Sequence, residues 1–78
     1  MTHTQHMPDF AALVTKERNL TEDVAEIAGT TPATVRWWRH VGRGPRGFTL
    51  PGSRRTIYMR ADLIAWLEDA YRNSQTDA

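Results

Sequence analysis

The arginines are the residues of this sequence best suited to binding a ligand. Seven arginines and no acidic residue lie between Thr31 and Arg60, a stretch with a charge of +7, whereas the stretches before and after it each carry −3. A guanidinium group is always charged and donates paired hydrogen bonds to phosphate oxygens. A basic block between two acidic ones indicates a face that meets a polyanion, although an arginine run can also be only a solvated surface.

Part of this block lies on a predicted helix over Pro32–Val41. At 100° per residue, Val35 and Trp38 share one side of the helix, and the opposite side carries Ala33, Arg36, Trp37 and His40. A stripe of small, basic and aromatic residues suits the major groove of DNA, where arginine contacts guanine edges and apolar groups contact the thymine methyl. The alternative is that Trp37 packs beneath the first helix and that Arg36 is merely solvated.

More basic residues follow this helix in the chain. Ser53, Arg54 and Arg55 lie near a predicted turn, and two guanidiniums at the tip of a hairpin suit a DNA backbone or a narrow minor groove. An arginine pair on a turn is weak support alone, but beside two helices joined by a tight turn it indicates a wing. Additional phosphate contacts are expected from residues around the helix and hairpin, namely Thr31, Thr34, Arg43, Arg46 and Arg60.

Other kinds of chemistry have little support in the sequence. His3 and His6 have no carboxylate or cysteine close by in the chain, His40 is alone, and a metal site needs more ligands than these. Ser53 has no histidine at a spacing typical of a triad, and the acidic residues are scattered over helix faces. We therefore expect no metal, no cofactor, no small-molecule substrate and no enzymatic activity.

The basic residues need a scaffold, and the helix and strand signals predict one. Apolar spacing predicts helices over Pro8–Arg18, over Thr21–Gly29 with Thr21 as the N-cap, and over Ala61–Tyr71. Only Gly29 and Thr30 separate the second helix from the third, which Thr31 caps, Pro32 begins and Gly42 ends. Strands over Phe48–Leu50 and Thr56–Tyr58 flank a turn at Pro51–Arg54. The predicted fold is mainly α with a small β-hairpin: a winged helix-turn-helix with an extra N-terminal helix.

The length and composition set the limits of this fold. With 78 residues we expect one domain over residues 8–72, with disordered ends at residues 1–7 and 73–78. The chain has no cysteine, so neither a disulfide nor a thiolate zinc site is available, and the three tryptophans are expected to help hold the core. No stretch approaches the roughly 20 apolar residues of a membrane span, and the start lacks signal-peptide features, so we expect no membrane contact and a cytoplasmic location.

Three stretches of the chain, Leu20–Ala25, Trp38–Pro45 and Tyr58–Leu67, carry a resemblance to a known family. Residues 20–71, which are 52 of the 78, resemble the excisionases of phages and integrative elements and their AlpA-like relatives, which share a winged helix-turn-helix with MerR regulators. By this resemblance, Arg36, Trp37 and Arg39 match the reading helix, and Arg54 and Arg55 match the basic wing tip. The first helix is an addition to the family pattern, and Trp37 stands where many relatives have a polar or basic residue.

The resemblance implies a recombination directionality factor that binds specific sequences in double-stranded DNA without catalysis. Several copies of such a protein bind cooperatively at repeated sites, bend the attachment-site DNA and direct a partner integrase towards excision, in the host cytoplasm if the protein is encoded by a phage. A small transcriptional regulator that binds promoter DNA is the alternative. A third possibility is a protein-interaction module that uses Trp37 and the first helix, which leaves the arginine block unexplained.

These roles predict measurable differences between the arginines. If about five of them neutralise phosphates, the logarithm of the affinity should fall with the logarithm of the salt concentration with a slope near −4.5. We expect Arg36→Ala to relax sequence preference and Arg54→Ala to weaken binding to all sequences alike.

Overall fold

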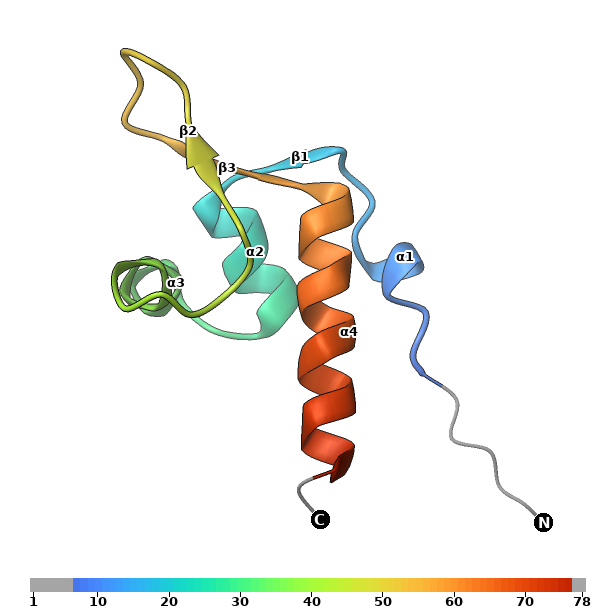
Figure 1. Cartoon of the computed structure of the whole chain (residues 1–78). Helices are drawn as coiled ribbons and strands as arrows, with labels where there is room; N and C mark the ends of the chain where they lie inside the picture. Colours follow the sequence, from blue (N-terminus) through green and yellow to red (C-terminus); the bar gives the residue numbers. More distant parts are fainter. Residues whose placement is uncertain (1–6, 77–78) are drawn as a thin grey trace, which may run out of the picture.

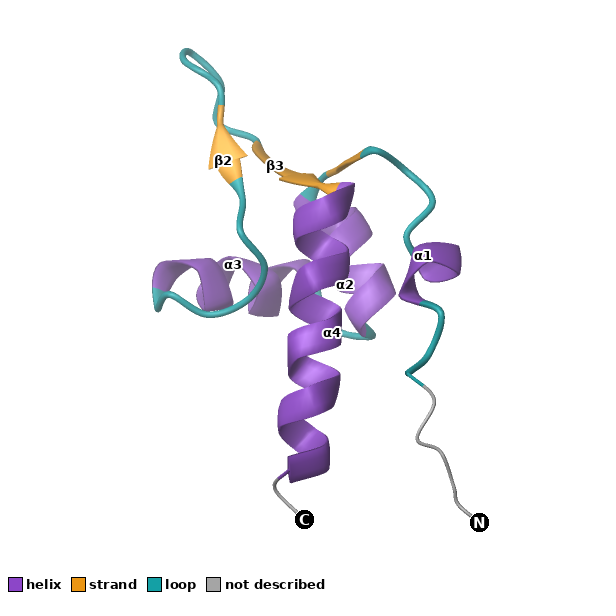
Figure 2. Ribbon diagram, turned by 45° about the vertical axis from the view of Figure 1, so that its right-hand side comes forward, coloured by secondary structure: helices purple, strands orange, loops and turns teal. Residues whose placement is uncertain are grey.

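The computed structural model describes residues 7–76, which form four helices and three strands (Figure 1). In chain order they are α1 (Phe10–Leu13), β1 (Arg18–Asn19), α2 (Thr21–Ala28), α3 (Pro32–His40), β2 (Phe48–Thr49), β3 (Thr56–Met59) and α4 (Arg60–Thr76). About half of these residues are helical, so the predicted class, mainly α with a small β-hairpin, is confirmed. The helices α2 and α3 pack together, and α1 lies against α4 on the side away from α3 (Figures 1 and 2).

The N-terminal segment differs from the prediction of a helix over Pro8–Arg18, which is wrong. Only the four residues of α1 are helical, and the chain is already extended at Val14, whose side chain is fully buried. Farther along, Arg18–Asn19 pairs as a strand with β3, and the Asn19 side-chain amide donates to the carbonyl of Tyr58 at 3.4 Å. Burial of Val14 and pairing with a distant strand outweigh the helical spacing, because tertiary contacts routinely override local propensity.

The helix pair α2 and α3 follows the local signals closely. Gly29 ends α2 in the left-handed conformation with φ of 74°, and the Thr31 hydroxyl caps α3 by accepting from the Thr34 N–H at 3.2 Å. The expected N-cap of α2 is displaced by one residue. Leu20 occupies the cap, Thr21 is the first helical residue, and the Asp23 carboxylate accepts from the Leu20 N–H at 2.9 Å. A carboxylate three residues into the helix thus satisfies the backbone N–H of the cap residue, while the leucine side chain caps none of the N–H groups of the first turn.

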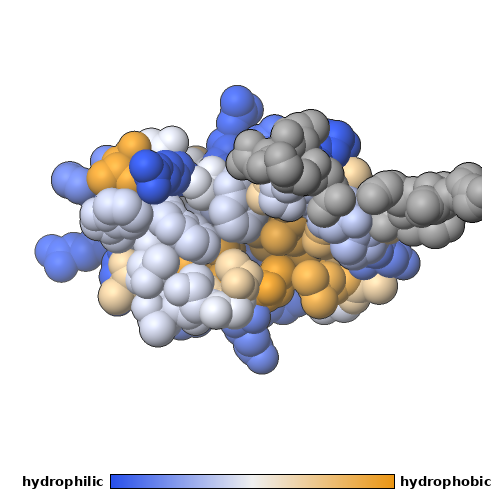
Figure 3. Space-filling model, turned by 90° about the horizontal axis from the view of Figure 1, so that it is seen from below, coloured by the Kyte–Doolittle hydropathy of each residue, from blue (hydrophilic) through white to orange (hydrophobic). Residues whose placement is uncertain are grey.

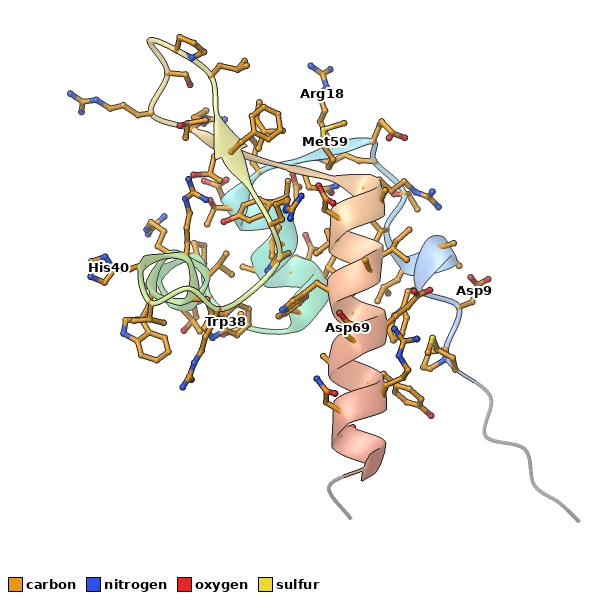
Figure 4. The ribbon with its side chains drawn as sticks, viewed as in Figure 1. Asp9, Arg18, Trp38, His40, Met59 and Asp69 are labelled. Atoms are coloured by element: carbon orange, nitrogen blue, oxygen red, sulfur yellow. The ribbon has the colours of Figure 1, made fainter. Side chains whose placement is uncertain are left out.

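The predicted hairpin is present and belongs to a three-stranded antiparallel sheet in the order β1-β3-β2. Phe48 pairs with Ile57, and Arg18 pairs with Met59. Because side chains alternate along a strand and paired residues share a face, the inner face carries Asn19 and Tyr58, which are each 1% exposed. Arg18 and Met59 share the outer face and lie side by side at the top of Figure 4.

The core lies where the sheet, the helix pair and α4 meet. Its buried apolar members are Val14, Val24, Ala25, Val35, Tyr58 and Leu63, and Trp38 and Trp66 pack against them with ring centroids 5.4 Å apart. Two of the three tryptophans therefore support the core as expected, whereas Trp37 is 51% exposed. Seen from below, hydrophobic surface gathers near the middle of the molecule and hydrophilic residues project around its edge (Figure 3).

The last helix is longer than the predicted Ala61–Tyr71. It begins at Arg60 directly after β3 and continues to Thr76, so the expected disordered tail over residues 73–78 is wrong for residues 73–76. Within this extension the Ser74 hydroxyl donates to the Tyr71 carbonyl, and just before it the Tyr71 ring packs edge-on against Phe10 of α1. The helix therefore extends beyond the apolar spacing that predicted it. The expected disorder over residues 1–7 falls, apart from Met7, outside the described residues, as do His3 and His6.

Candidate nucleic-acid interface

The helix α3 presents the predicted polar stripe to solvent. Val35 is 1% exposed on the core side, whereas the stripe residues are all exposed, namely Ala33, Arg36, Trp37 and His40. Figure 4 shows His40 pointing away from the body of the molecule, while Trp38 lies on the side of α3 that faces α4. At the N-terminus of the helix, Thr31 is exposed and Thr34 is half-buried. The division into a core side and an outward side matches the helical wheel.

Trp37 has no place in the core. The idea that it packs beneath the first helix is wrong, because its side chain is about half exposed and α1 lies on the other side of α4 (Figure 1). The Arg43 guanidinium lies over the Trp37 ring, with 5.6 Å between the guanidinium carbon and the ring centroid. A contact of this kind contributes about 0.5–1 kcal/mol at an exposed site. Together with Val41, which is also exposed, these residues form a surface at the C-terminal end of α3.

Arg39 connects α3 to the segment that leads into the hairpin. Its Nη1 donates to the carbonyl of Gly47 at 3.2 Å, although the side chain remains exposed. Gly47 lies so close to β3 that an added Cβ would be 2.7 Å from the Tyr58 ring and 2.8 Å from the Thr56 methyl group. Only glycine fits at this close approach of residue 47 to β3 without a shift of the neighbouring side chains. Arg39 and Gly47 thus help set where the hairpin stands relative to α3, a role that sequence spacing did not reveal for Gly47.

The tip of the hairpin is a tight turn that leaves its two arginines in solvent. The Ser53 N–H donates to the Leu50 carbonyl at 3.0 Å, and the Ser53 hydroxyl accepts from the Arg55 N–H at 3.1 Å. The turn places Gly52 at φ of 82°, a conformation that favours glycine. Ser53 therefore shapes the turn with its hydroxyl, while Arg54 and Arg55 are exposed.

A shallow hollow of about 160 Å³ joins α3 to the hairpin. Arg36 from α3 lines it together with Arg54 and Arg55 from the hairpin. The remaining lining residues come from the start of α2 and from β3, namely Leu20, Thr21, Glu22 and Thr56. The hairpin rises on the same side of the molecule as α3 (Figures 1 and 2). The two basic surfaces are therefore adjacent, as the DNA-binding hypothesis requires, but the contribution of Thr21, Glu22 and Thr56 was not predicted.

Two of the expected flanking arginines differ in environment. Arg46 is exposed. Arg60 instead holds the N-terminal segment: its Nε donates to the Val14 carbonyl at 2.6 Å and its Nη2 to the Ala11 carbonyl at 2.8 Å. These bonds place Arg60 on the α1 side of the molecule with its guanidinium engaged by the backbone. We therefore remove Arg60 from the candidate interface.

Glu22 lines the hollow, but no arginine of the basic surface forms an ion pair in the part of the chain that the structure describes. The ion pairs there are Lys16–Asp23 at 2.9 Å and Asp69–Arg72 at 2.8 Å, both outside the basic block. In the first pair, the hydrogen bond from the Leu20 N–H and the contact with Lys16 hold the pKa of Asp23 below its ordinary value. Because the arginines of α3 and the hairpin lack such partners, their field is directed outward to solvent.

In comparisons with known proteins, the chain matches no family, no curated protein and no solved structure. Among residues 7–76, no three His, Cys, Asp or Glu side chains gather in a way that suits a metal ion. None of the helices in that range has an apolar stretch of the length that a bilayer crossing requires.

Proposed function

We propose that this protein binds specific sequences in double-stranded DNA as a winged helix-turn-helix. In this proposal α2 and α3 form the helix-turn-helix, α3 is the reading helix, and the β2–β3 hairpin is the wing. The observation that carries the proposal is the hollow that Arg36 of α3 shares with Arg54 and Arg55 of the hairpin. These three guanidiniums are exposed, lie on one side of the molecule and form no ion pair among the described residues, so folding does not explain their placement. Binding to a polyanion does explain it.

Docking follows from the shapes of the two elements. The major groove is about 12 Å wide and admits a helix, so α3 enters it with its outward stripe against the base edges. Trp37 brings a large apolar surface that suits a thymine methyl, and Ala33 allows close approach. The hairpin then reaches the adjacent backbone or minor groove with Arg54 and Arg55. Arg43 and Arg46 lie close to α3 in the chain and add phosphate contacts.

We further propose that the biological role is that of an excisionase, in line with the family resemblance of residues 20–71. Bending DNA over one small site costs on the order of 1–6 kcal/mol. A single copy of so small a module does not readily supply this energy, so several copies bind cooperatively at neighbouring sites. The bent complex then favours the excisive reaction of a partner integrase.

DNA binding is tested by a fluorescence anisotropy titration with duplexes selected from a random library. With the five arginines Arg36, Arg43, Arg46, Arg54 and Arg55 at three to five phosphates, the log–log salt slope should lie between about −2.7 and about −4.5. The control is Arg18→Ala, because Arg18 is equally exposed but lies on the outer face of the sheet. This variant should bind like the wild type. A slope near zero would defeat the DNA assignment.

The excisionase role is tested separately by a recombination assay with a candidate partner integrase, run with and without this protein. Excision that depends on this protein, together with DNA bending seen by gel mobility of permuted fragments, is the expected result. Sequence-specific binding without any effect on excision would instead favour a promoter-binding regulator.

A further inference from the structure

The hollow between α2, α3 and the hairpin combines three positive charges with a single acidic residue. Arg36, Arg54 and Arg55 line it, and Glu22 is the only carboxylate among its lining residues. Within residues 7–76, no hydrogen bond or ion pair holds any of the three guanidiniums. Three positive charges outnumber the one carboxylate and repel one another, so the free protein carries an electrostatic cost here that a further anion relieves.

We propose that this hollow holds one phosphodiester group of the DNA backbone, an inference that rests on the proposed function and deepens it. The size fits, because a solvent-open hollow of about 160 Å³ has room for a phosphate group. The chemistry fits as well. Guanidiniums match phosphate oxygens with paired N–H donors, and the hydroxyl-bearing Thr21 lines the same hollow.

This assignment changes the role of Arg36. By sequence alone Arg36 was expected to read a guanine edge, but in the structure it faces the same hollow as the two hairpin arginines. We therefore assign it to a phosphate, and the base edges are left to the residues on the rest of the stripe: Ala33, Trp37 and His40. Phosphate contacts set register and orientation rather than sequence preference. A single phosphate bound by Arg36 of α3 and by Arg54 and Arg55 of the hairpin fixes the angle between α3 and the wing on the duplex.

Glu22 provides a direct test of whether the ligand is negatively charged. If the hollow receives a phosphodiester, the Glu22 carboxylate repels it, and Glu22→Gln should tighten DNA binding about 2- to 5-fold at low salt. The matched control is Glu26→Gln on the same helix, because Glu26 is exposed and does not line this hollow. The control should change affinity less. If Glu22→Gln weakens binding, Glu22 serves to pair with the arginines, and the phosphate assignment is wrong.

The location of the phosphate is tested by neutralising single phosphates in a selected duplex with methylphosphonate. The wild-type protein should lose about 10-fold in affinity at one position, in line with a charge-assisted contact of about 1.5 kcal/mol or more. At that position Arg36→Ala should be less sensitive to the substitution than the wild type, and so should the double variant Arg54→Ala/Arg55→Ala. Arg43→Ala, whose guanidinium lies over Trp37 instead, should remain sensitive. All the altered side chains are exposed, and circular dichroism verifies that each variant is folded.

The outcomes separate this inference from the proposed function. If Arg36→Ala keeps its sensitivity at every phosphate and loses discrimination at one base pair, Arg36 reads a base and the inference fails, while DNA binding stands. If the helix and hairpin variants become insensitive at two different phosphates, the hollow does not hold one shared group. A wild-type protein that binds no duplex overturns both proposals.

Discussion

Trp37 and Trp38 are adjacent in α3, yet Trp37 faces solvent and Trp38 packs against the core. Trp38 packs against Trp66, and Gly44 lies against the Trp38 side chain, whereas Trp37 is half exposed. We predict that Trp38→Ala lowers the free energy of unfolding by about 2–3 kcal/mol, less than the ~3–5 kcal/mol of a fully buried tryptophan. Trp37→Ala should cost no more than about 1 kcal/mol, mainly the contact with Arg43. Urea denaturation measures both. Equal losses would show that Trp37 has a core role.

Asp23 makes stability depend on pH in a defined direction. The Leu20 N–H, and then Lys16, stabilise its carboxylate, so the pKa in the folded protein lies below the ordinary value of 3.8. A group with a depressed folded pKa stabilises the fold above its unfolded pKa, and this contribution is lost as the pH falls through the folded value. Asp23→Asn should therefore be less stable than the wild type at neutral pH, with the difference shrinking in strong acid. Glu26→Gln, which removes an exposed carboxylate from the same helix, is the control matched in charge, and urea denaturation over a pH series measures both variants.

At the scale of elements, the placement of the β2–β3 hairpin depends on a close approach to β3 that only glycine permits. An added Cβ at Gly47 would meet the buried Tyr58 ring at 2.7 Å, so either the ring or the chain must move. We predict that Gly47→Ala costs about 1–3 kcal/mol, in the range of overpacked cores, and also weakens DNA binding by displacing the hairpin. Phe48→Ala is the control, because Phe48 is exposed and paired with Ile57, a contact of about 0.2–1 kcal/mol. If the Gly47 variant is as stable as this control, the space beside Tyr58 admits a methyl group and does not require glycine.

The elements that the sequence predicted well are those with local signals. Gly29, Thr31 and Pro32 define the turn between α2 and α3 by their own conformations and hydrogen bonds, and alternation with a glycine turn defines the hairpin. The larger misses fall where such local signals are weak or where a distant partner decides. Arg18–Asn19 becomes a strand only because β3 is there to pair with, and residues 73–76 lie outside the apolar spacing that predicted α4. The same holds for the hollow, since its Thr21, Glu22 and Thr56 join Arg36 only in three dimensions.

At the scale of the whole molecule, the arginines of one basic block are divided between folding and surface. Arg60 donates to the carbonyls of Ala11 and Val14 and ties the N-terminal segment to the start of α4, whereas Arg54 stands free at the hairpin tip. Hydrogen bonds from charged groups contribute about 1.5–3 kcal/mol each, with less expected where solvent reaches the pair. We predict that Arg60→Ala lowers the free energy of unfolding by about 1–3 kcal/mol and leaves the salt slope of DNA binding unchanged.

Arg54→Ala should do the opposite: stability stays within about 0.5 kcal/mol of the wild type, and the salt slope becomes shallower by up to about 0.9. The pair is matched in charge, so a loss caused merely by a lower net charge would appear equally in both variants. Urea denaturation and anisotropy titrations over a salt series, on the same preparations, measure the two quantities. If Arg60→Ala also makes the slope shallower, Arg60 contacts phosphate, and the separation between a folding side and a binding side of the molecule is lost.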